Sequence, residues 1–193
     1  MVIHLIFDLH ALSQVSSLYT ENMTKIGLFY GPQEGNVEKV AKLVASKIEN
    51  VDLVKVKEVD ANAFDAYDNI ILGISTLGKH TWASDNEGND WDQFLPKMNG
   101  IDLKGKKVAI FGLGDHIAYA DFFVDAMGEL FEVVKKTGAT VVGSVSDEGY
   151  EFNESRAFID GKFVGLPVDE DFEEDMTEER VDNWLKIILP EMK

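Results

Sequence analysis

With 193 residues, the chain is long enough for one sizeable core and short for two domains. Hydrophobic residues make up 45% of it, which excludes a disordered chain, and the absence of cysteine excludes disulfides, thiolate metal sites, iron–sulfur clusters and cysteine nucleophiles. The formal net charge of -17 repels nucleic acid and anionic membranes and attracts basic protein surfaces, although solubility alone would also explain it. No run of residues is apolar and long enough to span a bilayer, and we expect a cytoplasmic protein.

Residues 1–22 differ in composition from the rest of the chain. Their apolar start is interrupted by Asp8 and His10 and has no Lys or Arg before it, so the segment is a poor secretory signal. Met23 then stands just before a strong strand pattern. We therefore predict a functional domain over residues 23–193, preceded by an extension or a misassigned start over residues 1–22.

Strand and helix patterns alternate from Met23 onward. Apolar runs of strand length predict five strands, over residues 25–30, 51–57, 69–75, 106–114 and 139–145. Apolar residues at three- and four-residue spacing predict helices over residues 36–50, 120–138 and 177–189. We expect Gly138 to end the second helix, Thr177 to cap the third, and Pro190 to follow it. Strands separated by helices imply right-handed crossovers, and therefore a three-layer α/β domain with a mainly parallel sheet.

An unusually long connection, residues 146–175, separates the fifth predicted strand from the last helix. It holds an apolar stretch of its own over residues 161–168, and we interpret it as an excursion that returns to the sheet edge rather than as a second domain. Earlier in the chain, Trp91, Phe94 and Leu95 are more typical of a helix core than of a cofactor site.

Ligands of an open parallel sheet bind beyond the C-terminal ends of its strands, so the loops after the first, third and fourth strands are the candidate sites. The first loop, residues 31–36, lies before a helix N-terminus, where backbone N–H groups and the helix dipole suit phosphate. It is neither a Walker loop nor a G-x-G-x-x-G motif, so neither nucleoside triphosphate hydrolysis nor dinucleotide binding is expected. Taken alone, it is equally compatible with an ordinary turn.

The other two loops suit a flat ligand. The second, residues 75–82, offers two hydroxyl groups, an apolar side chain that can pack on a ring, and a glycine. The third, residues 112–122, carries two glycines, an acid and Tyr119. Each loop is weak evidence, but all three follow the strands at which a ligand is expected.

These loops contain no nucleophile with a base and no paired catalytic carboxylates, and we expect neither a catalytic nor a metal site. His80 and His116 lack triad or metal-type spacing and are predicted to face solvent. A cluster of acids suggests Ca²⁺ but lacks the Gly and terminal Glu of an EF-hand loop, so a solvated acidic loop is expected. Its members are Asp85, Glu87, Asp90 and Asp92.

Four segments of the chain resemble the flavodoxin family, namely residues 25–31, 111–128, 147–152 and 161–171. The resemblance runs from about Met23 to the C-terminus, and the last two segments resemble long-chain members. It implies a flavodoxin-like fold, a three-layer doubly wound five-stranded parallel sheet of order 2-1-3-4-5. It also implies a monomeric, low-potential one-electron carrier that holds FMN without a covalent bond and meets a reductase and acceptor enzymes through their basic surfaces.

The resemblance further implies which residues bind the cofactor. Leu77 would cover the inner face of the flavin, Tyr119 would stack on its outer face, and the Gly78 carbonyl would meet N5. The backbone of residues 113–115 would meet the pyrimidine edge, and the first loop would hold the phosphate. The full implied set is Gly31, Pro32, Gln33, Glu34, Gly35, Asn36, Val37, Ser75, Thr76, Leu77, Gly78, Lys79, Leu113, Gly114, Asp115, Tyr119 and Asp121.

Two departures from the family pattern concern this site. The family's phosphate loop is rich in Ser and Thr, whereas this chain has Pro32, Glu34 and Val37 there, which predicts weaker FMN binding. Leu77 stands where many members place Trp, although Trp82 could fold back instead. Two alternatives therefore stay open: a small FMN-dependent NAD(P)H or quinone reductase of the same fold, and a flavodoxin-like module with weakened FMN binding.

Overall fold

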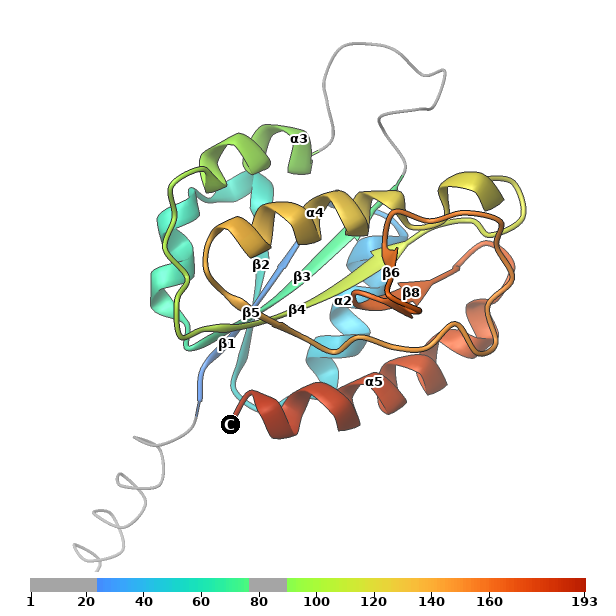
Figure 1. Ribbon diagram of the computed structural model, residues 1–193. Coiled ribbons are helices and arrows are strands. Elements are labelled where there is room, and N and C mark those ends of the chain that lie inside the picture. Colours follow the sequence, from blue (N-terminus) through green and yellow to red (C-terminus); the bar gives the residue numbers. More distant parts are fainter. Residues whose placement is uncertain (1–23, 77–89) are drawn as a thin grey trace, which may run out of the picture.

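The computed structural model describes residues 24–76 and 90–193 and shows a parallel sheet between two layers of helices (Figure 1). The strands of this sheet are β1 (Ile26–Tyr30), β2 (Val51–Lys55), β3 (Asn69–Ser75), β4 (Lys107–Leu113), β5 (Thr140–Val142) and β8 (Leu166–Val168). They run parallel in the order β2-β1-β3-β4-β5, which confirms the predicted topology. The C-terminal ends of β1, β3 and β4 consequently meet at one edge of the sheet.

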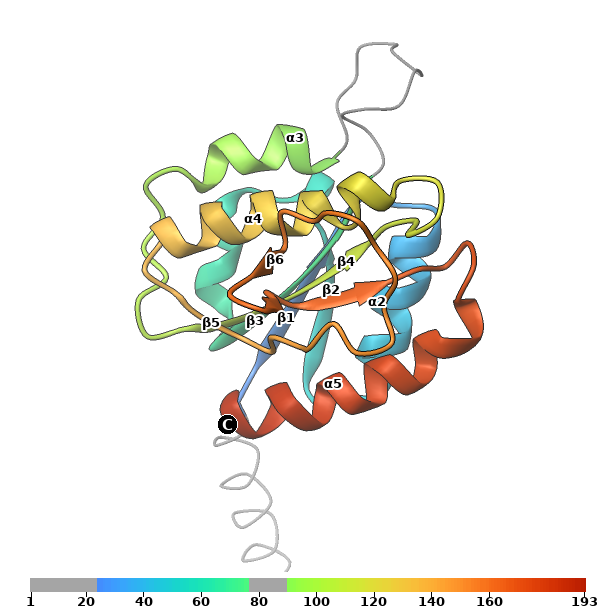
Figure 2. The ribbon, with the colours of Figure 1, turned by 45° about the vertical axis from the view of Figure 1, so that its right-hand side comes forward.

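The fifth position of the sheet is divided between two strands, so the sheet has six strands rather than five. β5 pairs with the start of β4, at Lys107–Ala109, and β8 pairs with its end, at Phe111–Leu113. Between them the chain makes the small antiparallel pair of β6 (Phe158–Ile159) and β7 (Lys162–Phe163), which lies beside β8 and outside the main sheet (Figure 2). The predicted excursion therefore does return to the sheet edge.

The predicted fifth strand stops early because of Gly143. This residue has φ +86°, and a Cβ there would lie 2.6 Å from the indole nitrogen of Trp184. The same indole N–H donates to the Gly143 carbonyl (2.8 Å). The helix that carries Trp184 therefore lies too close to residue 143 for a side chain at this position.

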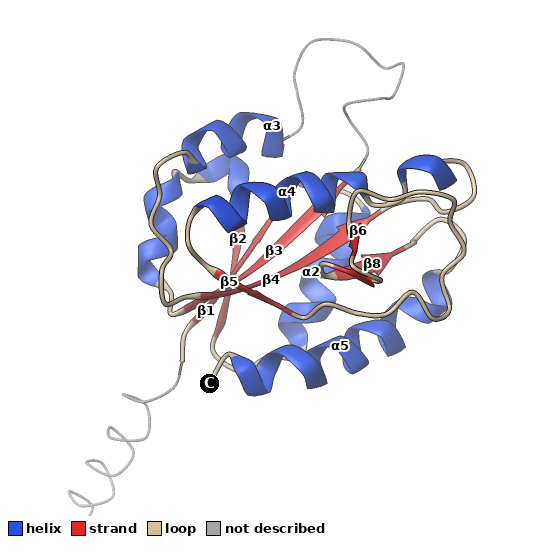
Figure 3. Ribbon diagram, viewed as in Figure 1, coloured by secondary structure: helices blue, strands red, loops and turns tan. Residues whose placement is uncertain are grey.

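Helices cover both faces of the sheet (Figure 3). α2 (Asn36–Ser46) and α5 (Thr177–Glu191) lie on one face, and the short α3 (Asp90–Phe94) and α4 (Asp125–Lys136) lie on the other. Each face has its own core, built from alternate residues of the central strands. Trp91 and Phe94 are buried in the core under α3, as predicted. Within the described parts of the chain, no helix combines the length and the apolar character needed to cross a membrane.

Several element boundaries differ from the predictions. α4 begins at Asp125 rather than at residue 120, because Val124 adopts a left-handed backbone (φ +49°) after a short 3₁₀ turn. Thr177 is the first helical residue of α5 and not its cap, and its hydroxyl donates to Glu170 Oε1 (2.5 Å). α5 also includes Pro190 in its last turn, where the loss of one intrahelical hydrogen bond does not interrupt a helix that is about to end.

Candidate functional site

A pocket opens beyond the C-terminal ends of β1, β3 and β4, where the sequence predicts a ligand. Its lining brings together residues from all three candidate loops and from the segment after β8. The lining residues are Pro32, Glu34, Gly35, Asn36, Val37, Ser75, Thr76, Leu113, Gly114, Asp115, Tyr119, Phe122, Glu170 and Asp171. Phe122, Glu170 and Asp171 were not predicted. Since β8 pairs with the end of β4, the acidic run that follows β8 reaches the same edge of the sheet.

The start of α2 presents free backbone donors to this pocket. The first intrahelical hydrogen bond is made by the Lys39 amide, which donates to the Gly35 carbonyl (3.1 Å). The N–H groups of Gly35, Asn36 and Val37 have no hydrogen-bond partner among the described residues. Together with the positive end of the helix dipole, these donors suit an anion or another strong acceptor.

The part of the loop before Gly35 is bonded to other parts of the chain. The Gly31 amide donates to the Gly73 carbonyl (3.2 Å), and the Gln33 amide donates to Asp90 Oδ2 (3.0 Å). Neither Gly31 nor Gln33 lines the pocket, although both belong to the predicted set. The prediction of a solvated acidic loop is wrong for Asp90, because its carboxylate anchors the first candidate loop.

The second loop contributes a buried hydroxyl group. The Thr76 amide donates to the Leu113 carbonyl (3.0 Å), which ties the end of β3 to the end of β4. The Thr76 hydroxyl is buried and has no partner in the described chain, yet it lines the pocket. A buried hydroxyl without a partner is unfavourable, so a polar ligand atom would satisfy it. Leu77, Gly78, Lys79, His80 and Trp82 lie outside the described residues.

The third loop is shaped by its own hydrogen bonds. Asp115 Oδ1 accepts the amides of Ile117 (2.9 Å) and Ala118 (2.6 Å), and the Asp115 carbonyl accepts the amide of Tyr119 (3.2 Å). This turn leaves the Tyr119 side chain 39% exposed at the pocket, available to a planar ligand.

Two predicted residues of the third loop are engaged elsewhere. The Gly114 amide donates to the Val168 carbonyl (3.0 Å), so this N–H is not available to a ligand, although Gly114 lines the pocket. Asp121 does not line the pocket, and its Oδ1 accepts a hydrogen bond from Asn153 Nδ2 (2.9 Å).

His116 does not face solvent, which corrects the prediction. Its side chain is 13% exposed, and its Nδ1 lies 2.5 Å from Oδ2 of Asp169, a carboxylate with no exposed surface. Burial alone would raise the pKa of Asp169, but donors hold it below its usual value. They are the backbone amides of His116, Phe172 and Asp171 together with the His116 ring. The pair fastens the third loop to the segment after β8.

The pocket is acidic. Four of its described lining residues carry carboxyl groups, Glu34, Asp115, Glu170 and Asp171, and none of the described lining residues is Lys, Arg or His. Glu170 Oε2 is buried, and its charge is balanced by Lys39 Nζ at 2.8 Å. Partial burial, and then the negative charges of neighbouring carboxylates, raise the pKa of Asp171. Over the described ranges, no group of three or more His, Asp or Glu side chains is arranged to hold a metal ion.

Comparisons with known proteins identify the family. The flavodoxin family model matches residues 28–184. The flavodoxin of Synechocystis is 43% identical over 171 residues, which cover 87% of this chain and 98% of that protein. The flavodoxin of Haemophilus influenzae is 40% identical over 174 residues, which cover 88% of this chain and 97% of that protein. A crystal structure of Fusobacterium nucleatum flavodoxin bound to flavin mononucleotide superposes with a TM-score of 0.77, at 28% identity, over 89% of this chain and all of that one.

The strand order is that of a doubly wound α/β protein. The pocket lies at the carboxyl ends of β1, β3 and β4, where the strand order reverses and where such proteins bind their ligands. The matches cover most of this fold at up to 43% identity. The chain belongs to the flavodoxin family.

Proposed function

We propose that this protein binds FMN without a covalent bond and carries electrons one at a time. The observation that carries the proposal is the pocket, which joins the free amides of α2, the unpartnered Thr76 hydroxyl and the Tyr119 ring in a member of the flavodoxin family. Flavodoxins are electron-transfer proteins rather than enzymes, so a role as reductase is the alternative that the experiments below must exclude.

The residues present fit this cofactor at specific points. The amides of Gly35, Asn36 and Val37 would meet the phosphate end, and the Thr76 hydroxyl would bond to a polar atom of the ligand. Tyr119 would stack on the outer face of the ring, and Leu77 would cover the inner face. The bound flavin supplies the redox chemistry, while the protein positions it, shields it from water and sets the charge around it.

Partners, assembly and location follow from the family and the charge. The side chains of Ile117, Phe122 and Phe172 are apolar and exposed, and the chain as a whole is strongly acidic. Such a surface favours transient contact with basic surfaces on a reductase and on acceptor enzymes. We propose a monomeric cytoplasmic carrier of the long-chain type, in which the segment between β5 and β8 is the insertion.

The domain proper is proposed to begin at Met23. A chain that starts there should fold and bind FMN as the full chain does, and its melting temperature should stay within a few degrees. A larger drop would show that residues 1–22 contribute to the domain.

Titration with FMN tests the proposed cofactor. Adding the protein freed of flavin should quench flavin fluorescence saturably, with one FMN per chain. Thr76→Val should weaken binding by about tenfold, because it removes a buried hydroxyl that has no partner among the described residues and that the ligand would satisfy, without lowering the stability of the flavin-free protein. Thr140→Val makes the same change at an exposed position of β5 and should leave binding unchanged. Absence of any quenching would refute the proposed function.

A further inference from the structure

Two backbone donors of the loop before α2 are bonded to the protein's own carboxylates. The Glu34 amide donates to Glu38 Oε2 (2.8 Å), and the Gln33 amide donates to Asp90 Oδ2 (3.0 Å). Pro32 has no N–H to offer. None of the three residues between Gly31 and Gly35 therefore has a backbone N–H available to a ligand. Those of Gln33 and Glu34 are bonded within the protein, and Pro32 has none.

Within residues 24–76 and 90–193, positive charge does not replace these donors. Lys42 Nζ is paired with Glu38 Oε1 (2.7 Å), and Lys39 Nζ is paired with Glu170 (2.8 Å) and Glu174 (2.5 Å). A hydrogen bond from Lys42 and then the Glu34 amide lower the pKa of Glu38, so its carboxylate is charged at neutral pH. Among the described residues that line the pocket, none has a cationic side chain, whereas four carry carboxyl groups.

The remaining donors suit a smaller or less charged group than a phosphate dianion. The free amides of Gly35, Asn36 and Val37 can hold a hydroxyl group or a singly charged phosphate. A phosphate monoester at neutral pH brings three acceptor oxygens and a charge of about -1.5 to -2 close to the pocket's carboxylates. Each charge-assisted hydrogen bond that it lacks lowers its affinity by about ten- to a hundredfold.

We propose that flavin binding by this protein depends little on the terminal phosphate. The site then accepts a flavin whose ribityl chain ends in an uncharged hydroxyl, as in riboflavin, nearly as well as FMN. This inference rests on the proposed function, because it concerns which flavins enter the same pocket.

Parallel titrations of the flavin-free protein with FMN and with riboflavin test the inference. At about pH 7.5, FMN should bind less than about tenfold more tightly than riboflavin. A preference for FMN of about tenfold or more overturns the inference while leaving the proposed function intact. Failure to bind either flavin overturns both, so the two failures are distinguishable.

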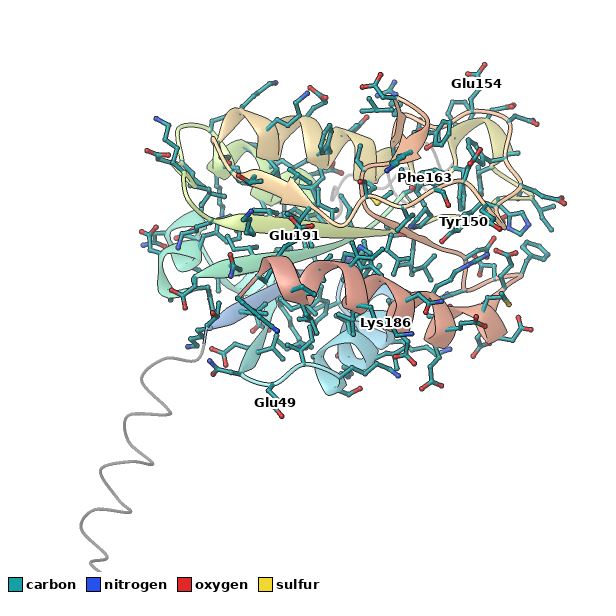
Figure 4. All side chains as sticks on the ribbon, turned by 60° about the horizontal axis from the view of Figure 1, so that its bottom comes forward. Glu49, Tyr150, Glu154, Phe163, Lys186 and Glu191 are labelled. Carbon is teal, nitrogen blue, oxygen red and sulfur yellow. The ribbon has the colours of Figure 1, made fainter. Side chains whose placement is uncertain are left out.

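Variants of Glu38 test the physical cause. Glu38→Ala frees the Glu34 amide and removes a negative charge, so it should raise the FMN affinity by about tenfold and change the riboflavin affinity much less. Glu38→Gln keeps an acceptor for that amide and removes only the charge, so its effect should be smaller. Glu49→Ala is the matched control, because Glu49 is exposed just beyond the far end of α2 and points away from the domain (Figure 4). An unchanged ratio of the two affinities in Glu38→Ala would overturn the proposal.

The preference for FMN should also depend on pH. Lowering the pH from about 8 to about 5 converts the phosphate from a dianion to a monoanion, since its second pKa is about 6. The ratio of FMN to riboflavin affinity should therefore rise as the pH falls. A ratio that falls over this range, or stays constant, contradicts the proposed repulsion.

Discussion

Glu34 holds a left-handed backbone conformation in the loop that meets the ligand. Its φ is +61°, a region that costs an ordinary residue about 1–2 kcal/mol and that glycine enters freely. Its amide is fixed there by the carboxylate of Glu38, whereas no described group bonds to its side chain. The loop conformation is thus maintained by the backbone and by Glu38, and not by the Glu34 side chain.

Substitutions at Glu34 should reveal this strain. We expect Glu34→Gly to keep the free energy of unfolding within about 0.5 kcal/mol of the original protein, because relief of strain offsets the greater freedom of the unfolded chain. Glu34→Thr should lower it by about 1–2 kcal/mol, because a β-branched residue resists positive φ. Urea unfolding of the flavin-free proteins measures both, and equal stabilities of the two variants would contradict the expected conformation.

Asp169 is a fully buried carboxylate that accepts hydrogen bonds from the amides of His116, Asp171 and Phe172. Its pKa is lowered in the folded protein, so it stabilises the fold above its unfolded pKa, and this contribution is lost as the pH falls through the folded value. Asp169→Asn should cost about 1–3 kcal/mol at pH 7 and progressively less below about pH 4.

Unfolding measured across this pH range checks the prediction. Asp175→Asn is the matched control, because it makes the same change at an exposed position in the same acidic segment and should have little effect at any pH. A cost of Asp169→Asn that persists unchanged at low pH would show that the charge of Asp169 is not what stabilises the loop.

Among the elements, the N-terminal edge of the sheet is held to the end of α5 by one side chain. Asn69 opens β3 and is buried, its Oδ1 accepts the amide of Lys107 at the start of β4 (3.0 Å), and its Nδ2 donates to the carbonyl of Met192 (2.8 Å). Three elements distant in the sequence are joined at this point, on the side of the sheet opposite the pocket.

Removing this side chain should destabilise the domain without changing the site. We expect Asn69→Ala to lower the free energy of unfolding by about 2 kcal/mol or more, because it leaves a partly buried amide and a buried carbonyl unpaired. Asn99→Ala, at an exposed position, should change it by less than about 0.5 kcal/mol. If Asn69→Ala weakened flavin binding as strongly as it lowered stability, the two ends of the sheet would be coupled, contrary to this account.

The central strands were predictable because their apolar sequence pattern matches their burial in the structure. The strands at residues 26–30, 69–75 and 107–113 are nearly continuous apolar runs. This pattern is typical of strands in a parallel sheet that is covered on both faces. The boundaries that differ depend on distant contacts. The fifth strand stops at Gly143 because Trp184 of α5 packs against it, and the left-handed Val124 delays α4.

The candidate loops were predictable for a different reason, since the ends of parallel strands always meet at one edge. The partners within the site could not be inferred from local sequence. His116 lies buried against Asp169, which is 53 residues away, and Asp90 bonds to Gln33 across 57 residues. Glu170 and Asp171 reach the pocket only because β8 pairs with β4, a register that the sequence pattern does not reveal.

At the scale of the whole molecule, the dominant feature is negative charge. Of the formal net charge of -17, only Asp8 and Glu21 lie before Met23, so nearly all of it belongs to the domain around the pocket. A like charge at about 10 Å costs roughly 0.8 kcal/mol at an effective dielectric constant near 40, before screening by salt. Several such charges together should oppose the formation of an anion on a bound flavin, and should therefore separate the addition of the first electron from that of the second.

Reductive titration of the FMN complex tests the central claim most directly. Stepwise addition of a reductant without oxygen should give two resolved one-electron steps, with an absorption band at long wavelength that is largest near half reduction. Free FMN under the same conditions is the control. Direct conversion from the yellow oxidised complex to a colourless one, with no long-wavelength band, would contradict a one-electron carrier and favour a two-electron reductase.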